Sequence, residues 1–138
     1  GKLTLARLPM LPIDDYDRLL WSCEVNFVRG EDSWLRGLWA GRPMVWQPYR
    51  QADEAHRAKL DAFLAWQAQR LGGLAPAAYA ALADLSHAWS GATDPDLAWA
   101  RVRASLPALT AAFDTAARDA ATQRDLADQL VEFCNSKL

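Results

Sequence analysis

Apolar and polar positions divide the chain into a first part with short apolar or alternating runs and a second part with helical spacing. In the first part, the alternation over Lys2–Leu8 predicts a short strand. Apolar runs over Ser22–Val28 and Pro43–Gln47 predict two more strands, and short helical patterns separate the three. Strands that alternate with helices are typical of a parallel sheet.

Capping residues indicate where the two short helices begin and end. Asp14 or Asp15 can cap the first helix, and Asp32 or Ser33 can cap the second, because short polar side chains accept hydrogen bonds from free backbone N–H groups. Gly41 suits the position just after the second helix. The expected order is therefore strand, helix, strand, helix, strand.

Beyond residue 53 the apolar positions recur at helical spacing. Four helices are expected, and they begin after Asp53, near Pro76, near Asp94 and at Pro107. Glycines at the ends of the first two helices stop them. The fourth helix would carry one apolar stripe, made of Leu109, Phe113, Ala116, Ala120, Ala127, Leu130 and Cys134.

The whole chain, 1–138, is expected to form a single α/β domain, with a β/α region over 1–50 and a helical region over 53–138. A Rossmann-like sheet usually has five or more strands, so about three strands would make only a partial parallel sheet. One edge of that sheet would be exposed. Either helices cover this edge or the chain associates with something else.

Composition favours a soluble, folded protein, with 51% hydrophobic and 23% charged residues. A net charge of -2 argues against nucleic acid as a partner. No apolar run approaches the roughly 20 residues that cross a bilayer, so we expect no membrane association and a cytoplasmic location. Cys23 and Cys134 are expected to be reduced, buried thiols. His56 and His87 lack metal-ligand spacing and are expected to be structural.

The seven Trp are unusually many for this length. Most lie at helical or strand spacing with other apolar residues. They are expected to form core, or a surface that is buried against a missing partner domain.

The second predicted strand stops abruptly at Arg29, Gly30, Glu31, Asp32 and Ser33. In open α/β sheets, ligands bind beyond the carboxyl ends of parallel strands, where a helix N-terminus offers free N–H groups to anions. An arginine would add a permanent positive charge there. The pattern therefore favours an anion or nucleotide site, although it lacks the glycine spacing of a Rossmann or P-loop fingerprint. A simpler structural interpretation is a capped helix in which the arginine neutralises the two carboxylates.

The run Asn-Phe-Val-Arg-Gly-Glu-Asp-Ser over 26–33 has distinctive neighbours, Leu8–Trp21 before it and Trp39–Gln51 after it. Together this block closely resembles the C-terminal part of the elongation factor P arginine rhamnosyltransferases. The resemblance runs from Leu8 to about Leu64, the first half of the chain. It implies the GT-B fold and transfer of L-rhamnose from dTDP-rhamnose to one arginine of the translation factor.

The resemblance also implies roles for the residues at the strand end. Arg29, Gly30 and the N-terminus of the helix at Ser33 would hold the donor diphosphate, and the Ser33 hydroxyl would bind it too. Glu31 and Asp32 would contact phosphate, ribose or the reacting sugar. The growing negative charge on the leaving diphosphate would be stabilised by an arginine and a helix dipole, so no metal and no cofactor beyond the donor substrate are expected.

Two tyrosines take roles from the same resemblance. Tyr49 would donate its hydroxyl to the diphosphate, and Tyr16 would stack on the thymine ring. Without the resemblance, Tyr16 would be interpreted as a core aromatic of its short helix, and Tyr49 equally as a diphosphate ligand or as a half-buried loop aromatic beside Pro48. Ile13 stands where the family typically has a glutamine that reads the thymine edge, so base selectivity would be weaker or come from the loop backbone. Glu24 replaces the usual aspartate, a milder change.

The resemblance places the aspartates that act on the acceptor arginine in an N-terminal domain that is absent here. Asp14, Asp15 and Asp17 are better read as caps and helix charges. No catalytic residue is assigned in this chain, and Glu31 is named only as a candidate. We therefore expect donor binding without turnover. Two alternatives remain: a helical protein-interaction module without nucleotide binding, and a GT-B enzyme with another nucleotide sugar.

Overall fold

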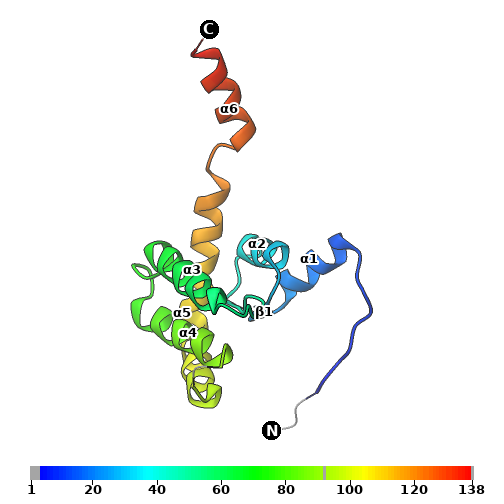
Figure 1. The fold of residues 1–138 in the computed structure, drawn as a ribbon, viewed down its shortest axis with the longest axis vertical. Coiled ribbons are helices and arrows are strands. Elements are labelled where there is room, and N and C mark those ends of the chain that lie inside the picture. The colour runs from blue at the N-terminus through cyan, green and yellow to red at the C-terminus, as the bar shows by residue number, and fades with distance from the viewer. Residues whose placement is uncertain (1–3, 92, 138) are drawn as a thin grey trace.

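The computed structural model of the chain describes residues 4–91 and 93–137. Its first part is α/β and its second part is helical, which confirms the predicted class (Figure 1). The elements are α1 (Ile13–Ser22), β1 (Asn26–Val28), α2 (Glu31–Trp39), β2 (Met44–Trp46), α3 (Ala55–Leu71), α4 (Pro76–Trp89), α5 (Pro95–Ala121) and α6 (Leu126–Asn135). No helix among these is long and apolar enough to span a bilayer.

The sheet of the described residues consists of β1 and β2, which pair in parallel. Phe27 lies opposite Val45, and α2 forms the connection between the strands. All three residues of β2 are buried. The parallel pairing was predicted correctly, but each strand is shorter than its apolar run, with three residues of each paired in register.

The third strand, predicted over Lys2–Leu8, is wrong for the described residues 4–8, and Lys2 and Leu3 lie outside the described part. Residues 4–12 form neither strand nor helix, and residues 4–10 are exposed. In Figure 1 this segment, in dark blue, runs away from the rest of the molecule. A strand needs a neighbour for its backbone hydrogen bonds. Without one, alternation alone does not make a strand.

The prediction that side chains cap the two short helices is also wrong. The residues before α1 and α2 are Pro12 and Gly30, and neither helix has a side-chain cap. Asp14, Asp15 and Asp32 lie inside the first turns, where a negative charge still favours the helix through its dipole. Ser33 is the third residue of α2 rather than its cap.

Gly41 occupies the position after α2 that was predicted for it. Its φ of +63° is a left-handed conformation that glycine adopts without strain. A Cβ atom there would lie 3.1 Å from the Cβ of Ala117 on α5. The glycine therefore lets the chain turn from α2 into β2 directly against α5.

The third and fourth predicted helices form one helix, α5, with Pro107 inside it. The prediction that Pro107 begins a helix is therefore wrong. Val102 and Leu109 on either side of it are both buried in the same core, and their packing offsets the hydrogen bond that proline removes. Leu109 and Phe113 are buried as the apolar stripe predicted.

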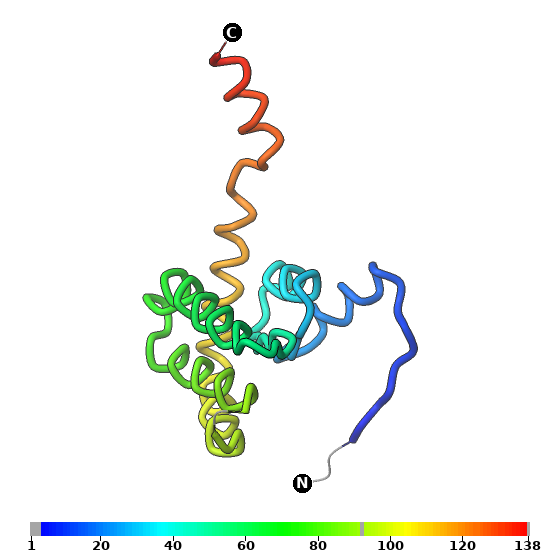
Figure 2. Tube along the Cα trace, viewed as in Figure 1, coloured from blue at the N-terminus to red at the C-terminus, as the bar shows by residue number. Residues whose placement is uncertain are grey.

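The end of the predicted stripe belongs to a separate helix, α6, which has no buried residues. Figure 2 shows the trace of α6, in red, leading away from the other helices. Leu130 and Cys134 are exposed, so their predicted burial is wrong, and Cys23 is only half-buried. Asp125, which caps α6 by accepting from the N–H of Asp128, explains why a new helix starts there.

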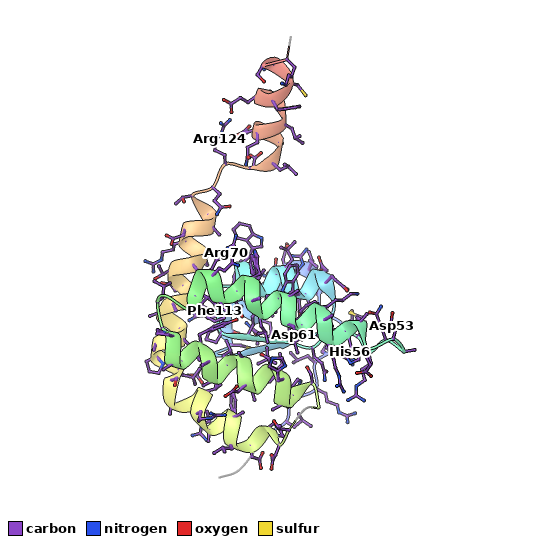
Figure 3. The ribbon with its side chains drawn as sticks, turned by 60° about the vertical axis from the view of Figure 1, so that its left-hand side comes forward. Asp53, His56, Asp61, Arg70, Phe113 and Arg124 are labelled. Atoms are coloured by element: carbon purple, nitrogen blue, oxygen red, sulfur yellow. The ribbon has the colours of Figure 1, made fainter. Side chains whose placement is uncertain are left out.

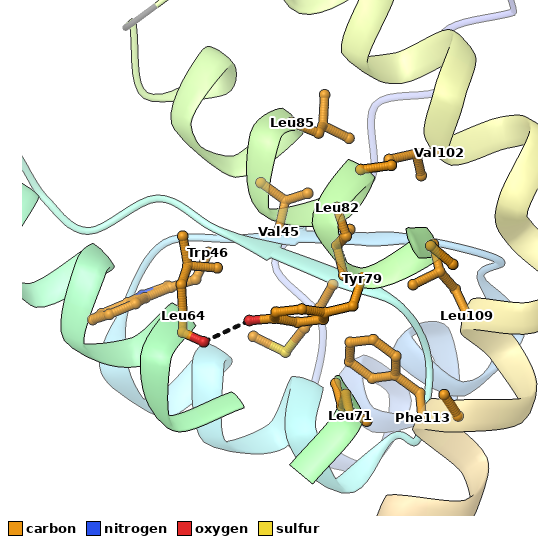
Figure 4. Packing of buried hydrophobic residues seen from close by; sticks show 14 of the residues in the cluster. Val45, Trp46, Leu64, Leu71, Tyr79, Leu82, Leu85, Val102, Leu109 and Phe113 are labelled. Atoms are coloured by element: carbon orange, nitrogen blue, oxygen red, sulfur yellow. Dashed lines mark hydrogen bonds between the residues drawn. The ribbon is translucent and has the colours of Figure 1, made fainter. Parts of the chain in front are cut away.

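The core lies between α3, α4, α5 and the sheet (Figure 4). Val45, Leu82, Val102 and Leu109 are almost completely buried in it. Beside this aliphatic centre lies an aromatic cluster, which we define as Trp34, Trp46, Phe63 and Trp66. The tryptophans are divided between core and surface: Trp46 is buried, whereas Trp21, Trp39 and Trp89 are about half-exposed.

Candidate functional site

The two parallel strands bring the segments that follow them to one edge of the sheet. Arg29 and Gly30 connect β1 to α2, and Gln47, Pro48 and Tyr49 follow β2. The N–H of Gln47 donates to the carbonyl of Val28 at 2.9 Å, which extends the pairing beyond the strands. The N-terminus of α2 therefore lies at this edge, and its first N–H groups have no partner within the helix.

Arg29, Gly30 and Tyr49 come together there. The Arg29 guanidinium lies 5.0 Å from the centre of the Tyr49 ring, which is cation–π distance. A Cβ atom on Gly30 would lie 3.7 Å from the Tyr49 hydroxyl oxygen. Both long side chains are exposed. This edge of the sheet thus brings together a positive charge, a phenol hydroxyl and a helix N-terminus.

The neighbouring carboxylates are paired with a different arginine. Arg36 Nε donates to Asp32 at 3.0 Å, and Arg36 Nη1 donates to both oxygens of Asp17 at 2.9 and 3.0 Å. Hydrogen bonds to Asp17 and then Asp32 raise the pKa of Arg36 above its ordinary value. The interpretation that Arg29 neutralises Asp32 is therefore wrong. Among the ion pairs of residues 4–91 and 93–137, none uses Arg29.

Glu31 and Ser33 complete the first turn of α2. Glu31 is exposed and Ser33 is half-buried. Neither side chain takes part in a hydrogen bond or ion pair of the described ranges. These two residues lie in the same turn as the free N–H groups at the start of the helix.

Tyr16 lies on a different element, α1, where it is half-buried against the core. Its neighbour Asp17 is bound by Arg36, so an ion pair holds α1 to α2. Ile13 is the first residue of α1 and half-exposed. The structure therefore links Tyr16 to the Arg29–Tyr49 edge through α2 and does not place it in the same cluster.

Three contacts that support this edge come from residues that were not predicted to matter. Trp46 Nε1 donates to the carbonyl of Arg29 at 2.8 Å. Gln47 Nε2 donates to the carbonyl of Trp89 at 3.1 Å, and His56 Nδ1 accepts from the N–H of Gln51 at 3.3 Å. The first two contacts join segments far apart in sequence, so no local pattern could have revealed them.

The histidines make structural contacts. His56 is buried at the start of α3, near the labelled Asp53 in Figure 3. His87 Nε2 lies 3.6 Å from Asp61 on the neighbouring helix. In the described part of the chain, no three His, Cys, Asp or Glu residues gather in a way that could hold a metal ion.

A parallel sheet edge that carries an arginine and a helix N-terminus defines an α/β domain with a candidate anion-binding site. The family model described as "Elongation-Factor P (EF-P) rhamnosyltransferase EarP" matches residues 1–135. The chain belongs to this family. The family resemblance of the first half of the chain therefore extends over almost all of it.

Curated relatives agree with this assignment. The chain is 45% identical over 138 residues to the protein-arginine rhamnosyltransferase of Pseudomonas putida. This match covers 100% of the chain and 36% of the relative. It is 42% identical over 132 residues to the enzyme of the same name from Pseudomonas aeruginosa, covering 95% of this chain and 34% of the relative. The chain thus spans about a third of the length of these curated relatives.

A solved structure shares the fold. It is described as "Structural basis for EarP-mediated arginine glycosylation of translation elongation factor EF-P". The match has a TM-score of 0.75 and 42% sequence identity, and covers 94% of this chain and 40% of that chain.

Proposed function

We propose that this chain is the donor-binding part of a glycosyltransferase that moves L-rhamnose from dTDP-rhamnose to an arginine of elongation factor P. The relatives' names supply the reaction class, and the description of the solved structure names the acceptor protein. The observation that carries the donor role is the meeting of Arg29, Tyr49 and the N-terminus of α2 at one sheet edge. The family's GT-B architecture is part of the proposal.

The diphosphate of the donor is the group this edge fits best. Arg29 supplies a positive charge outside the described ion pairs, and the first N–H groups of α2 supply hydrogen bonds and a partial positive charge. In glycosyl transfer, negative charge grows on the departing nucleoside diphosphate. Groups that bind the diphosphate therefore also stabilise the transition state.

The other site residues take their places around this group in the proposal. Ser33 and Tyr49 offer hydroxyl groups to the diphosphate, and Glu31 and Asp32 contact phosphate, ribose or sugar. Tyr16 stacks on the base from α1. Glu31 is the one candidate for a catalytic role in this chain. Donor binding without turnover is expected, and rhamnosyl transfer to elongation factor P by this chain alone would refute that expectation.

A calorimetric titration of the chain with dTDP tests the donor role. Arg29→Ala should weaken binding about 10- to 100-fold, because a charge-assisted hydrogen bond contributes roughly 1.5–3 kcal/mol. Arg118→Ala is the matched control, since this exposed arginine on α5 pairs with Asp114 away from the sheet edge. Equal affinity of both variants for dTDP would refute the role of Arg29.

The choice of base needs a separate comparison. Ile13, the half-exposed first residue of α1, cannot donate a hydrogen bond to thymine. Titration with UDP under the same conditions distinguishes a thymidine donor from another nucleotide sugar. Binding of UDP as tight as that of dTDP would favour a GT-B enzyme with another donor.

A protein-interaction module is the second candidate, and α6 favours it. Leu126, Leu130, Val131 and Phe133 of this helix are all more than half-exposed. If the chain acts only through such a surface, Arg29→Ala will leave its binding to partner proteins unchanged and dTDP will not bind. The dTDP titration therefore separates the two candidates.

A further inference from the structure

The carbonyl of Arg29 has an unusual position in the backbone of the candidate site. The carbonyl before it, on Val28, accepts from Gln47 in the extension of the sheet. The carbonyl after it, on Gly30, accepts from Trp34 in the first turn of α2. Arg29 thus lies between the last sheet bond and the first helix bond, and neither element provides a donor for its carbonyl.

Trp46 provides that donor. Its indole Nε1 lies 2.8 Å from the Arg29 carbonyl oxygen, a normal hydrogen-bond distance. The peptide between Arg29 and Gly30 is trans, so its N–H points opposite to its carbonyl. The hydrogen bond from Trp46 therefore fixes the direction of the Arg29 carbonyl and, with it, that of the Gly30 N–H, which faces away from the indole.

The Trp46 ring itself is held from two helices. Its ring centre lies 5.6 Å from that of Trp34 on α2 and 5.4 Å from that of Phe63 on α3. The side chain is only 6% exposed. A ring packed in this way cannot turn its N–H elsewhere without disturbing the aromatic cluster.

The segment that follows β2 contacts the side chain of Arg29. Tyr49, three residues beyond Trp46, carries the ring on which the guanidinium rests. Arg29 is therefore oriented at its backbone by Trp46 and at its side chain by Tyr49. Both orienting residues come from β2 and the segment that follows it.

We infer that Trp46 is a positioning residue for the donor site. Its indole N–H orients the Arg29–Gly30 peptide, and with it the N-terminus of α2 and the arginine that faces the diphosphate. Trp46 acts through Arg29 and touches no ligand itself. The inference rests on the proposed donor-binding function.

Trp34 offers a matched control within the same cluster. Its Nε1 is buried but has no hydrogen-bond partner among the described residues. Trp34→Phe and Trp46→Phe each remove the pyrrole part of one packed indole. Only Trp46→Phe also removes the hydrogen bond to Arg29, so the difference between the variants isolates that bond.

The test uses the whole chain and measures the NMR resonance of the Arg29 carbonyl carbon, the affinity for dTDP and the melting temperature. In Trp46→Phe the carbonyl resonance should move upfield as its hydrogen bond is lost. The affinity should fall about five- to tenfold, the equivalent of one neutral hydrogen bond. Trp34→Phe should leave the resonance and the affinity near those of the unaltered chain, even if it lowers the melting temperature as much as Trp46→Phe does.

Equal effects of the two variants on resonance and affinity would overturn the inference. Should the unaltered chain fail to bind dTDP, the proposed function of this chain fails, and the carbonyl resonance still decides whether Trp46 orients the peptide. Should Trp46→Phe not fold, proton exchange in the unaltered chain decides instead. The indole proton of Trp46 should then exchange more slowly than that of exposed Trp21, and equally fast exchange would overturn the inference.

Discussion

Tyr79 should make the stability of this domain fall at alkaline pH. Its side chain is 7% exposed, lies among apolar residues of α3 to α5, and donates from its hydroxyl to the carbonyl of Leu64 at 2.6 Å (Figure 4). Burial disfavours the charged phenolate and raises the pKa of Tyr79 from 10.0 to about 12. The phenol therefore keeps its proton in the folded state at a pH where the unfolded chain has lost it.

The sign and size of the effect follow from this difference. Below pH 10 both states hold the proton and pH has no effect through this group. Above pH 10 the unfolded state releases the proton and becomes more favourable, until the folded state also releases it near pH 12. Each pH unit in that interval is worth about 1.4 kcal/mol, so the free energy of unfolding should fall by about 2–3 kcal/mol.

Urea unfolding, followed by far-ultraviolet circular dichroism between about pH 9 and pH 11.5, measures this fall through the midpoint and slope of each curve. Tyr79→Phe should cost about 0.5–1.5 kcal/mol at neutral pH through the lost hydrogen bond, and should remove most of the alkaline fall. Tyr49→Phe, at an exposed tyrosine, should leave the fall in place. An alkaline fall of the same size in Tyr79→Phe would refute the reasoning.

Two further substitutions test the fold. Gly41→Ala should destabilise the chain by about 1–3 kcal/mol, because a side chain there is strained at φ +63° and crowds Ala117. Gly73→Ala is the control: a Cβ atom there would have no atom within 4 Å, so this variant should be close to neutral in the same urea assay. Pro107→Ala should raise the free energy of unfolding by about 1–3 kcal/mol, because the proline lies inside the continuous α5 and lacks an N–H. A loss of stability in Pro107→Ala would instead indicate a helix that begins at this residue.

The elements of the fold were predictable where a local pattern determines them. The apolar run before Arg29, the turn at Gly41 and the helical spacing after residue 53 each correspond to an element of the structure. Predictions failed where a distant partner decides. Residues 4–8 alternate like a strand but have no strand beside them, and Pro107 looks like a helix start until the burial of Val102 and Leu109 on both sides is known.

The candidate site divides in the same way. Arg29, Gly30 and the first turn of α2 are consecutive, so their meeting followed from the sequence alone. The approach of Tyr49 was inferred from the family resemblance, and its contact with Arg29 is a property of the parallel pairing. The pairing of Asp32 with Arg36 rather than Arg29 was missed, although the two residues lie four apart on the predicted helix, a spacing at which opposite charges pair. The bond from Arg36 to Asp17 joins two elements and has no such local signal.

The helical part of the chain carries little that is diagnostic in its sequence, yet the structure makes it the support of the candidate site. The carbonyl of Trp89 on α4 holds Gln47, and His56 on α3 holds the backbone at Gln51, so the segment around Tyr49 is fixed from both sides. Phe63 of α3 packs on the indole that orients Arg29. Residues of both regions, 1–50 and 53–138, therefore pack into one core, and the helical region contacts the candidate site. Substitutions in α3 or α4 that leave the fold intact should then act on nucleotide affinity, through the segment after β2, without contacting the nucleotide.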